Sequence, residues 1–251
     1  MKRRDVLQEA KERFVFVLGS RTGCRDDLND EVVITGPLSP REAIGEPDRD
    51  DFPILRGKEV LMQAVYRGCA GQAFTSASGN FQGSLEDVLE LPMRSTFERA
   101  VLVSTMNAVL RSLGLVEGTV HCKNEGPKEC SLHFGLWAKE QGADKVGLVG
   151  MQPAILEALV NVLGTERVMV SDLAEAGKIR CGLKVLDGLE PSRIFENCQL
   201  VLVTGSTLVN STIDCLMEDA LRHERRVVFF GTTIAGAARL LGLERLCFCS
   251  S

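Results

Sequence analysis

The most informative stretch of the sequence is Gln199-Leu-Val-Leu-Val-Thr-Gly-Ser-Thr-Leu-Val-Asn-Ser-Thr-Ile-Asp214. Its apolar run has no polar alternation, which is typical of a strand buried on both faces of a parallel sheet. Small hydroxyl residues and a glycine follow this run, and a second apolar pattern then begins. The stretch therefore predicts a strand, a turn and a helix.

The predicted turn lies at the carboxyl end of its strand, which is where open α/β sheets bind their ligands. Hydroxyl and amide side chains are dense here, whereas capping the next helix requires only one such residue. Backbone N–H groups at a helix start can also bind an anion. Capping by Asn210 and Ser211 is the structural alternative. A ligand-facing role is predicted for five residues of this segment: Thr204, Gly205, Ser206, Thr207 and Asn210.

The second half of the sequence alternates between strand and helix patterns. Strands are expected at residues 145–150, 167–172, 226–231 and 245–249, and helices at residues 153–163, 193–197, 213–221 and 236–241. Such alternation predicts a mostly parallel sheet wrapped by helices. The turn at residues 231–236 repeats the strand-then-hydroxyl pattern, so Thr232 and Thr233 are expected to line the same crevice as the first turn.

A second candidate ligand-binding feature is Gly147-Leu-Val-Gly150-Met-Gln-Pro153. It departs from the G-x-G-x-x-G fingerprint because Pro153 takes the place of the third glycine, so the usual mode of NAD binding is not expected. Gly150 still lies in the turn after a strand. Asp172 ends the next strand, at the position where an acidic side chain accepts ribose hydroxyls. A hydroxyl-bearing ligand and simple solvent exposure are the two alternatives for Asp172.

The first half of the sequence shows no regular alternation of strands and helices. We expect a short helix at residues 5–13, followed by strands at residues 14–18 and 31–35 that form an antiparallel pair across a loop at residues 20–30. The remaining expectations are a turn at residues 36–40, an exposed loop at 46–53, a helix at 57–67, a strand opening into a loop at 72–79 and a capped helix that begins at Ser84.

The longest helical pattern covers residues 96–113 and is stopped by Gly114. Asn107 sits among its apolar residues. A buried asparagine must find hydrogen-bond partners, so a structural hydrogen bond to a neighbouring loop and a contact with a ligand are equal alternatives.

Composition excludes several classes of function. The 251-residue chain has a net charge of −5 and only one Trp and one Tyr, whereas a nucleic-acid platform needs basic stripes and stacking aromatics. No apolar run approaches the roughly 20 residues that span a bilayer, and residues 1–5 do not lead into a signal-peptide core. We therefore expect a cytoplasmic protein that binds neither nucleic acid nor membrane. Whether it forms a homo-oligomer is open.

The nine cysteines are an odd number, which favours reduced thiols or metal ligands over a disulfide framework. Cys122 and Cys130, with His121 and His133 nearby, offer sulfur and imidazole ligands that suit a thiophilic transition metal. The spacing lacks paired C-x-x-C knuckles, so unremarkable reduced cysteines are the alternative. Cys247 and Cys249 share one face of the last predicted strand and are expected to be buried as small hydrophobic residues, as are Cys69, Cys181, Cys198 and Cys215.

The hydroxyl residues of the two turns are expected to bind a ligand rather than to act as nucleophiles. A Ser or Thr nucleophile needs an adjacent base, and no histidine lies near either turn in the sequence.

The quoted residues carry a family resemblance. The segment Val203-Thr-Gly-Ser-Thr-Leu-Val-Asn-Ser-Thr-Ile-Asp214, with Gly231-Thr-Thr233, resembles the putative heavy-metal chelation domain family, long a domain of unknown function. The likeness extends through Gly147-Leu-Val-Gly-Met-Gln-Pro153, through Thr119-Val-His-Cys122 to Cys130, and through Asn107-Ala108. Most of the chain is therefore covered.

This resemblance implies an architecture and a site. Residues 1–118 would form an α+β domain similar to the enolase amino-terminal domain, and residues 119–251 a Rossmann-like domain with partial likeness to methyltransferases. The active site would lie between them, with Asn107 contributing from the first domain. Three functions follow as alternatives. The first is binding of a small polar metabolite or metal chelate, with condensation or hydrolysis of pterin-, flavin- or siderophore-like molecules. The others are non-catalytic metal handling and methyl transfer from S-adenosylmethionine.

Overall fold

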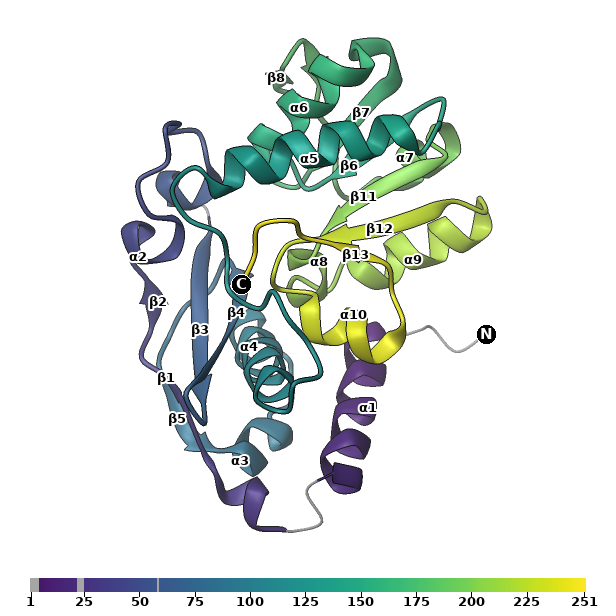
Figure 1. The fold of residues 1–251 in the computed structure, drawn as a ribbon. Coiled ribbons are helices and arrows are strands. Elements are labelled where there is room, and N and C mark those ends of the chain that lie inside the picture. Colours follow the sequence, from purple (N-terminus) through teal and green to yellow (C-terminus); the bar gives the residue numbers. More distant parts are fainter. Residues whose placement is uncertain (1–4, 22–24, 58) are drawn as a thin grey trace.

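The protein is described from a computed structural model that covers residues 5–21, 25–57 and 59–251. Within these residues the strands form a five-stranded antiparallel sheet, a six-stranded parallel sheet and a two-stranded ribbon. Figure 1 shows the antiparallel sheet on the left and the parallel sheet at the upper right. The predicted mixed α/β class with a parallel sheet is confirmed. The loop expected at residues 20–30 includes residues 22–24, which lie outside the described residues, as do residues 1–4.

The antiparallel sheet combines one hairpin with pairs between strands that are distant in the sequence. Its strands have the order β2-β3-β1-β5, and β4 also pairs with β3. Their bounds are β1 Glu31–Ile34, β2 Pro37–Leu38, β3 Val60–Tyr66, β4 Cys69–Thr75 and β5 Phe81–Ser84. The short helices beside this sheet are α2 Pro40–Ile44, the 3-10 helix η2 Pro53–Arg56 and α3 Leu85–Glu90, which follow a 3-10 helix η1 at Arg25–Asn29.

β3 shows that the helix predicted at residues 57–67 was wrong. Arg67 and Gly68, which join β3 to β4, both have positive φ angles, of 48° and 76°. Two consecutive residues with positive φ form the tight turn that matches the twist of a β-hairpin. β3 then pairs with β4 along its whole length, from Val60 opposite Thr75 to Tyr66 opposite Cys69. The turn and this pairing override the helical spacing of the apolar residues.

The first helix, α1 (Val6–Arg21), corrects a second prediction, because residues 14–18 form no strand. Ala10, Phe14 and Leu18 are buried at four-residue spacing, whereas Phe16 is 75% exposed. This is the periodicity of one helix face. The antiparallel pair expected between residues 14–18 and β1 therefore does not form, and β1 pairs with β3 and β5.

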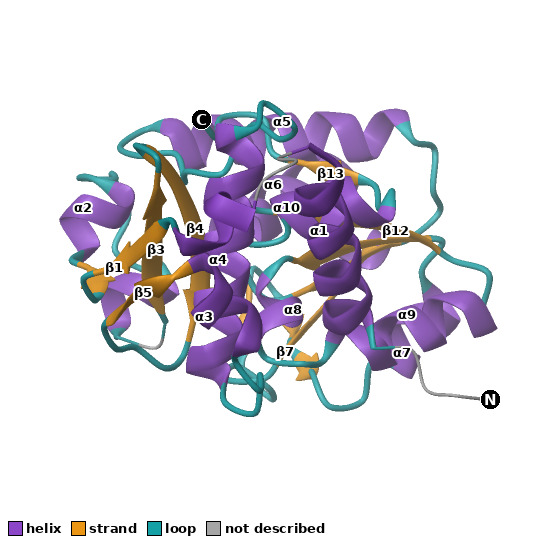
Figure 2. Cartoon of the chain, turned by 90° about the horizontal axis from the view of Figure 1, so that it is seen from below, coloured by secondary structure: helices purple, strands orange, loops and turns teal. Residues whose placement is uncertain are grey.

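The buried face of α1 packs against the second half of the chain. Its neighbour is α10 (Ala235–Leu241), and Figure 2 shows the two helices together. The backbone N–H of Val6 donates a 2.8 Å hydrogen bond to Asp214 Oδ1 in α9 (Ile213–Arg222). Arg13 Nη1 donates to the carbonyl of Leu240 over 3.3 Å. Helix α1 is thus held in place by α9 and α10.

The long helix α4 (Thr96–Ser112) connects the two sheets. It begins with a capping box, in which Ser95 and Glu98 each bond the other's backbone N–H. Its residues 100–110 are all buried. On β4, a Cβ at Gly71 would lie 2.2 Å from the backbone nitrogen of Ala108, so only glycine permits this close helix–sheet contact. The helix predicted at residues 96–113 is confirmed.

The parallel sheet has the strand order β10-β7-β6-β11-β12-β13. Its bounds are β6 Val146–Val149, β7 Val168–Asp172, β10 Leu186–Asp187, β11 Leu200–Thr204, β12 Arg226–Phe230 and β13 Arg245–Leu246, with β8 Ile179–Arg180 and β9 Leu183–Lys184 forming the separate ribbon. Leu200 and Leu202 pack in one buried cluster with α5 (Gly126–Glu140) and α6 (Pro153–Leu163). Val201 and Val203 pack in another, with α7 (Ser192–Asn197), α9 and α10. The sheet is therefore covered on both faces.

One expectation near the edge of this sheet was wrong. Helix α5 begins at Gly126, with Pro127 in its first turn, where its missing N–H costs nothing. The last strand ends at Leu246, so Cys247 and Cys249 do not lie on a strand face.

The division into residues 1–118 and 119–251 stays a prediction. One buried cluster contains side chains from both parts, including Met106 of α4 and Ala237 of α10. In the described part of the chain, no helix is both long and apolar enough to cross a membrane.

Candidate functional site

The candidate site begins where the chain leaves neighbouring parallel strands in opposite directions. From β6 the chain proceeds to β7 on one side, and from β11 it proceeds to β12 on the other. Open α/β sheets bind ligands at such a switch point. Gly150 follows β6 with a φ of +86°, and a Cβ there would lie 2.3 Å from Thr204 Cγ2 after β11. A glycine is thus required where the two turns meet.

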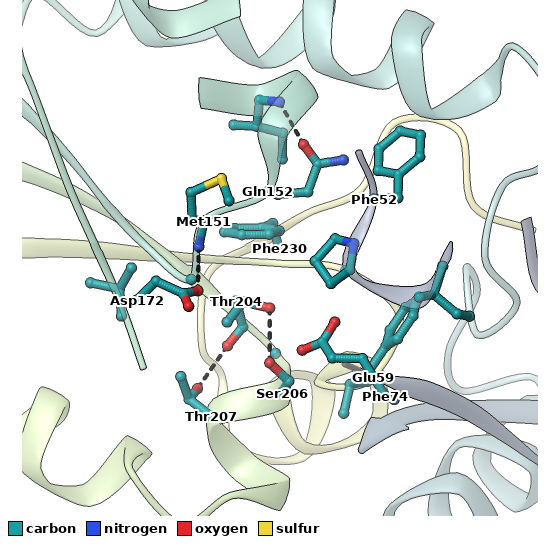
Figure 3. Close-up of a pocket in the computed structure, with 18 of the residues that line it drawn as sticks. Phe52, Glu59, Phe74, Met151, Gln152, Asp172, Thr204, Ser206, Thr207 and Phe230 are labelled. Atoms are coloured by element: carbon teal, nitrogen blue, oxygen red, sulfur yellow. Dashed lines mark hydrogen bonds between the residues drawn. The ribbon is translucent and has the colours of Figure 1, made fainter. Parts of the chain in front are cut away.

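A cavity of about 420 Å³ opens at this point. One side consists of the turns that follow β6, β7, β11 and β12. The other side comes from the antiparallel sheet and the segment before it, including Phe52, Glu59 and Phe74. Figure 3 shows these residues around the space above Thr204 and Ser206. The turns at residues 204–207 and 231–236 both contribute to it, as the sequence indicated.

The hydroxyl residues of the first turn divide into two groups. The hydroxyls of Thr204 and Ser206 lie 3.2 Å apart and face the cavity (Figure 3). Thr207 also lines it, but its hydroxyl donates to the carbonyl of Thr204 over 2.7 Å. Asn210 Oδ1 likewise accepts from the backbone N–H of Thr212 over 3.1 Å. Thr204 and Ser206 are therefore the hydroxyl groups best placed to contact a ligand.

The second turn contributes less than expected. Thr233 lines the cavity, but its Oγ1 accepts a 3.0 Å hydrogen bond from the backbone N–H of Phe74. Thr232 is buried, does not line the cavity, and its hydroxyl has no hydrogen-bond partner among the described residues. The ligand contact expected of Thr232 has no support in this geometry.

Asn107 takes the structural alternative. Its Nδ2 donates to the backbone carbonyls of Gln72, Thr232 and Thr233 over 2.9, 3.1 and 3.2 Å. Its Oδ1 accepts from the backbone N–H of Gly236 over 2.7 Å. The side chain is fully buried and does not line the cavity. It joins α4 to β4 and to the turn after β12, so it shapes the cavity wall without reaching a ligand.

Asp172 lines the cavity at the end of β7. Its Oδ2 accepts from the backbone N–H of Met151 over 2.9 Å (Figure 3). Its Oδ1 accepts from the N–H groups of Ala174 and Glu175 over 2.8 and 3.1 Å. The carboxylate thus fixes the two turns that flank the cavity. Its contact with a ligand hydroxyl stays a prediction.

Glu59 is a candidate site residue that the sequence did not reveal. It directly precedes β3, and its carboxyl points into the cavity towards Thr204 and Ser206 (Figure 3). Burial, followed by the negative charge of Asp172, raises the pKa of Glu59 to about 7. The apolar spacing of residues 57–67 favours a helix, and that prediction hides the position of Glu59. The only sequence signal is a single acidic residue just before an apolar strand.

Cysteines line the end of the cavity near α5. Cys122 and Cys130 are joined there by Cys247, which approaches from the segment after β13. Burial raises the pKa of Cys122 to about 12. Cys247 differs, because a hydrogen bond from Cys130 and further contacts with Ser250 and Arg245 outweigh its burial and lower its pKa. The sequence had placed Cys247 in a strand core, so its role at the cavity was not foreseen.

These thiols do not form a ready metal centre. Among residues 5–21, 25–57 and 59–251, no three His, Cys, Asp or Glu side chains are grouped so as to hold a metal ion. Nδ1 of His121 is engaged with the carbonyl of Cys122 at 2.6 Å. The arrangement does not fit the metal site expected from Cys122 and Cys130.

The sequence comparison finds a family model that matches part of the chain. Residues 133–242 match the model of a family described as "Putative heavy-metal chelation". The expected family resemblance is confirmed. The matched segment contains Gly150, Asp172 and the turn at residues 204–207, but Cys122, Cys130 and Cys247 lie outside it. The family match therefore concerns the switch-point side of the cavity.

Two solved structures of family members with unknown function have similar folds. The protein from Pyrococcus horikoshii aligns with a TM-score of 0.54 and 11% identity, over 91% of this chain and 79% of that chain. The protein from Desulfitobacterium hafniense aligns with a TM-score of 0.51 and 14% identity, over 94% and 84%. At these identities the likeness concerns the fold alone. No curated protein matches the chain, and no comparison supports the methyltransferase alternative.

Proposed function

We propose that the cavity binds a small polar metabolite or a metal chelate. One observation carries the proposal: the hydroxyls of Thr204 and Ser206 and the carboxyl of Glu59 converge on a largely apolar cavity at the switch point of a parallel sheet. A few convergent polar groups in an apolar cavity are typical of small-molecule sites. Gly150, Gly205 and Asp172 would shape this site, and Thr207, Asn210 and Thr233 would support it.

We also propose the finer features that the family resemblance implies. Residues 1–118 would be the enolase amino-terminal-like domain and residues 119–251 the Rossmann-like domain. The antiparallel sheet before residue 119 and the parallel sheet after it support this division. Condensation or hydrolysis of pterin-, flavin- or siderophore-like molecules in a cytoplasmic setting is the proposed activity.

Affinity selection tests ligand binding. The protein is incubated with a metabolite extract, separated from free compounds by gel filtration and analysed by mass spectrometry. A Ser206→Trp variant fills the cavity, and Ser20→Trp is the control because Ser20 is exposed on α1. We expect a compound that the wild type and Ser20→Trp retain and Ser206→Trp loses. Equal retention by all three proteins, or by none, would contradict the proposal.

Non-catalytic metal handling is the second candidate function. The observation that favours it is the match of residues 133–242 to the family described as "Putative heavy-metal chelation". Elemental analysis of protein purified without a histidine tag separates the two candidates. Stoichiometric metal that is lost in Cys122→Ser and Cys130→Ser, but kept in the exposed control Cys181→Ser, would favour metal handling. A metal-free wild type would favour the metabolite.

A further inference from the structure

Glu59 is the acidic group of the cavity whose charge is least compensated. Asp172, on the opposite side of the cavity, accepts three backbone N–H hydrogen bonds. Among the described residues, no hydrogen bond or ion pair involves the Glu59 side chain. A buried carboxyl without a partner is costly, and it offers a strong site for a complementary group.

The cationic side chains that line the cavity are already engaged elsewhere. Arg180 forms an ion pair with Glu175, which Lys178 also contacts at 2.9 Å. Arg56 Nε donates to the carbonyl of Asp50 over 3.4 Å. His121 stays neutral because burial lowers its pKa. Among the described residues, therefore, no cationic side chain that lines the cavity pairs with Glu59, and a cationic group of a ligand would supply that partner.

Aromatic rings form the walls beside Glu59. Figure 3 shows Phe52, Phe74 and Phe230 around the same space. Phe74 is held edge-on to the His121 ring at a centroid distance of 5.3 Å, and Phe230 is held edge-on to Phe134 at 5.9 Å. Fixed aromatic faces favour flat ligands, and their negative quadrupole favours cations.

We propose that the ligand of this cavity carries a planar cationic nitrogen group, of the amidinium, guanidinium or protonated amino-heterocycle class, which binds Glu59. The inference rests on the proposed function, because it names the chemistry of the molecule that the cavity holds. The N–H groups of such a ligand donate to the Glu59 carboxylate, and the hydroxyls of Thr204 and Ser206 accept further hydrogen bonds. An anionic ligand would instead face the carboxylates of Glu59 and Asp172.

Three probes of the same shape and different charge test this charge preference. Benzamidine is a planar cation, benzamide is its neutral counterpart and benzoate is an anion. Calorimetric titration of the wild type should show benzamidine binding at least about tenfold tighter than benzamide, with benzoate weakest, as expected for one charge-assisted contact. Equal affinity for benzamidine and benzamide, or no binding of benzamidine, would overturn the inference.

Variants of Glu59 assign the preference to this residue. Glu59→Gln should remove the preference for benzamidine, and Glu59→Asp should keep it in weaker form. Glu86→Gln is the matched control, because Glu86 is exposed on α3 and should leave the preference unchanged. Thermal unfolding of each variant verifies that it is folded. Retention of the full preference in folded Glu59→Gln would also overturn the inference.

The two proposals fail in distinguishable ways. If the wild type retains a metabolite that Ser206→Trp loses, but binds benzamidine and benzamide equally, the cavity binds a small molecule and the charge inference is wrong. If the extract yields no such compound and no probe binds, both proposals are wrong. If both hold, the retained compound should contain an amidine, guanidine or amino-heterocycle group.

Discussion

Folding moves the carboxyl of Glu59 from water into an apolar cavity. The stability of the folded protein therefore depends on pH. Its pKa is about 7 in the folded protein and 4.5 in its ordinary state, so the folded state binds the proton more tightly. That contribution to stability is fully present below pH 4.5 and is lost as the pH rises to about 7.

We therefore predict that Glu59→Gln flattens this pH dependence. Between pH 5 and pH 8, the free energy of unfolding of the wild type should fall by roughly 2–3 kcal/mol relative to Glu59→Gln. Urea denaturation at several pH values measures the difference, with Glu86→Gln as the control. Parallel pH curves for the wild type and Glu59→Gln would show that the carboxyl of Glu59 is not buried in this way.

Asn107 joins three segments through hydrogen bonds to their backbones, so its replacement should destabilise the folded protein. Asn107→Ala leaves buried carbonyl and N–H groups without partners and should lower the free energy of unfolding by roughly 2–4 kcal/mol. Asn197→Ala, at an exposed position of α7, should change it by less than about 0.5 kcal/mol. Chemical denaturation of both variants gives the comparison, and similar values would exclude the joining role.

The residues of the site differ in how far the sequence could predict them. Asp172, Thr204 and Ser206 lie at or just after the carboxyl ends of strands in a parallel sheet. All strands of such a sheet end at the same edge, so the sequence pattern alone places these residues together. Glu59 and Cys247 reach the cavity only through the packing of the two sheets and through the segment after β13. No local pattern encodes those distances, so the sequence could not place these two residues.

At the scale of single elements, α1 and β3 show why the first half was harder to predict than the second. Residues 14–18 are β-branched and aromatic, which favours a strand, but burial of every fourth residue against α10 selects a helix. β3 has helical spacing, but a tight turn and β4 select a strand. In the second half, each strand carries its own apolar run and its own turn, so local patterns were sufficient.

The packing of α1 can be tested with two phenylalanines of the same helix. Phe14→Ala removes a fully buried ring and should lower the free energy of unfolding by roughly 3–5 kcal/mol. Phe16→Ala removes a ring that is mostly exposed and should change it by less than about 0.5 kcal/mol. Denaturant unfolding followed by circular dichroism measures both variants. Equal effects would mean that α1 does not present this face to α10.

At the scale of the whole molecule, the shared buried cluster predicts one cooperative unfolding transition. The chain has one Trp and one Tyr, and they report on different halves: Trp137 lies on α5 and Tyr66 on β3. Trp137 fluorescence in the wild type and Tyr66 fluorescence in a Trp137→Phe background should give unfolding curves that each coincide with circular dichroism of the same protein. Two separate midpoints would instead indicate that residues 1–118 and 119–251 fold independently.

The contact between α1 and α10 has a consequence for how the protein is made. α1 leaves the ribosome before α10 does, so its apolar side has no docking place while the residues between the two helices are being made. Until α10 emerges, Phe14 and Leu18 remain open to misassociation or to a chaperone. An early helix thus reaches its final position only after a much later one has been synthesised.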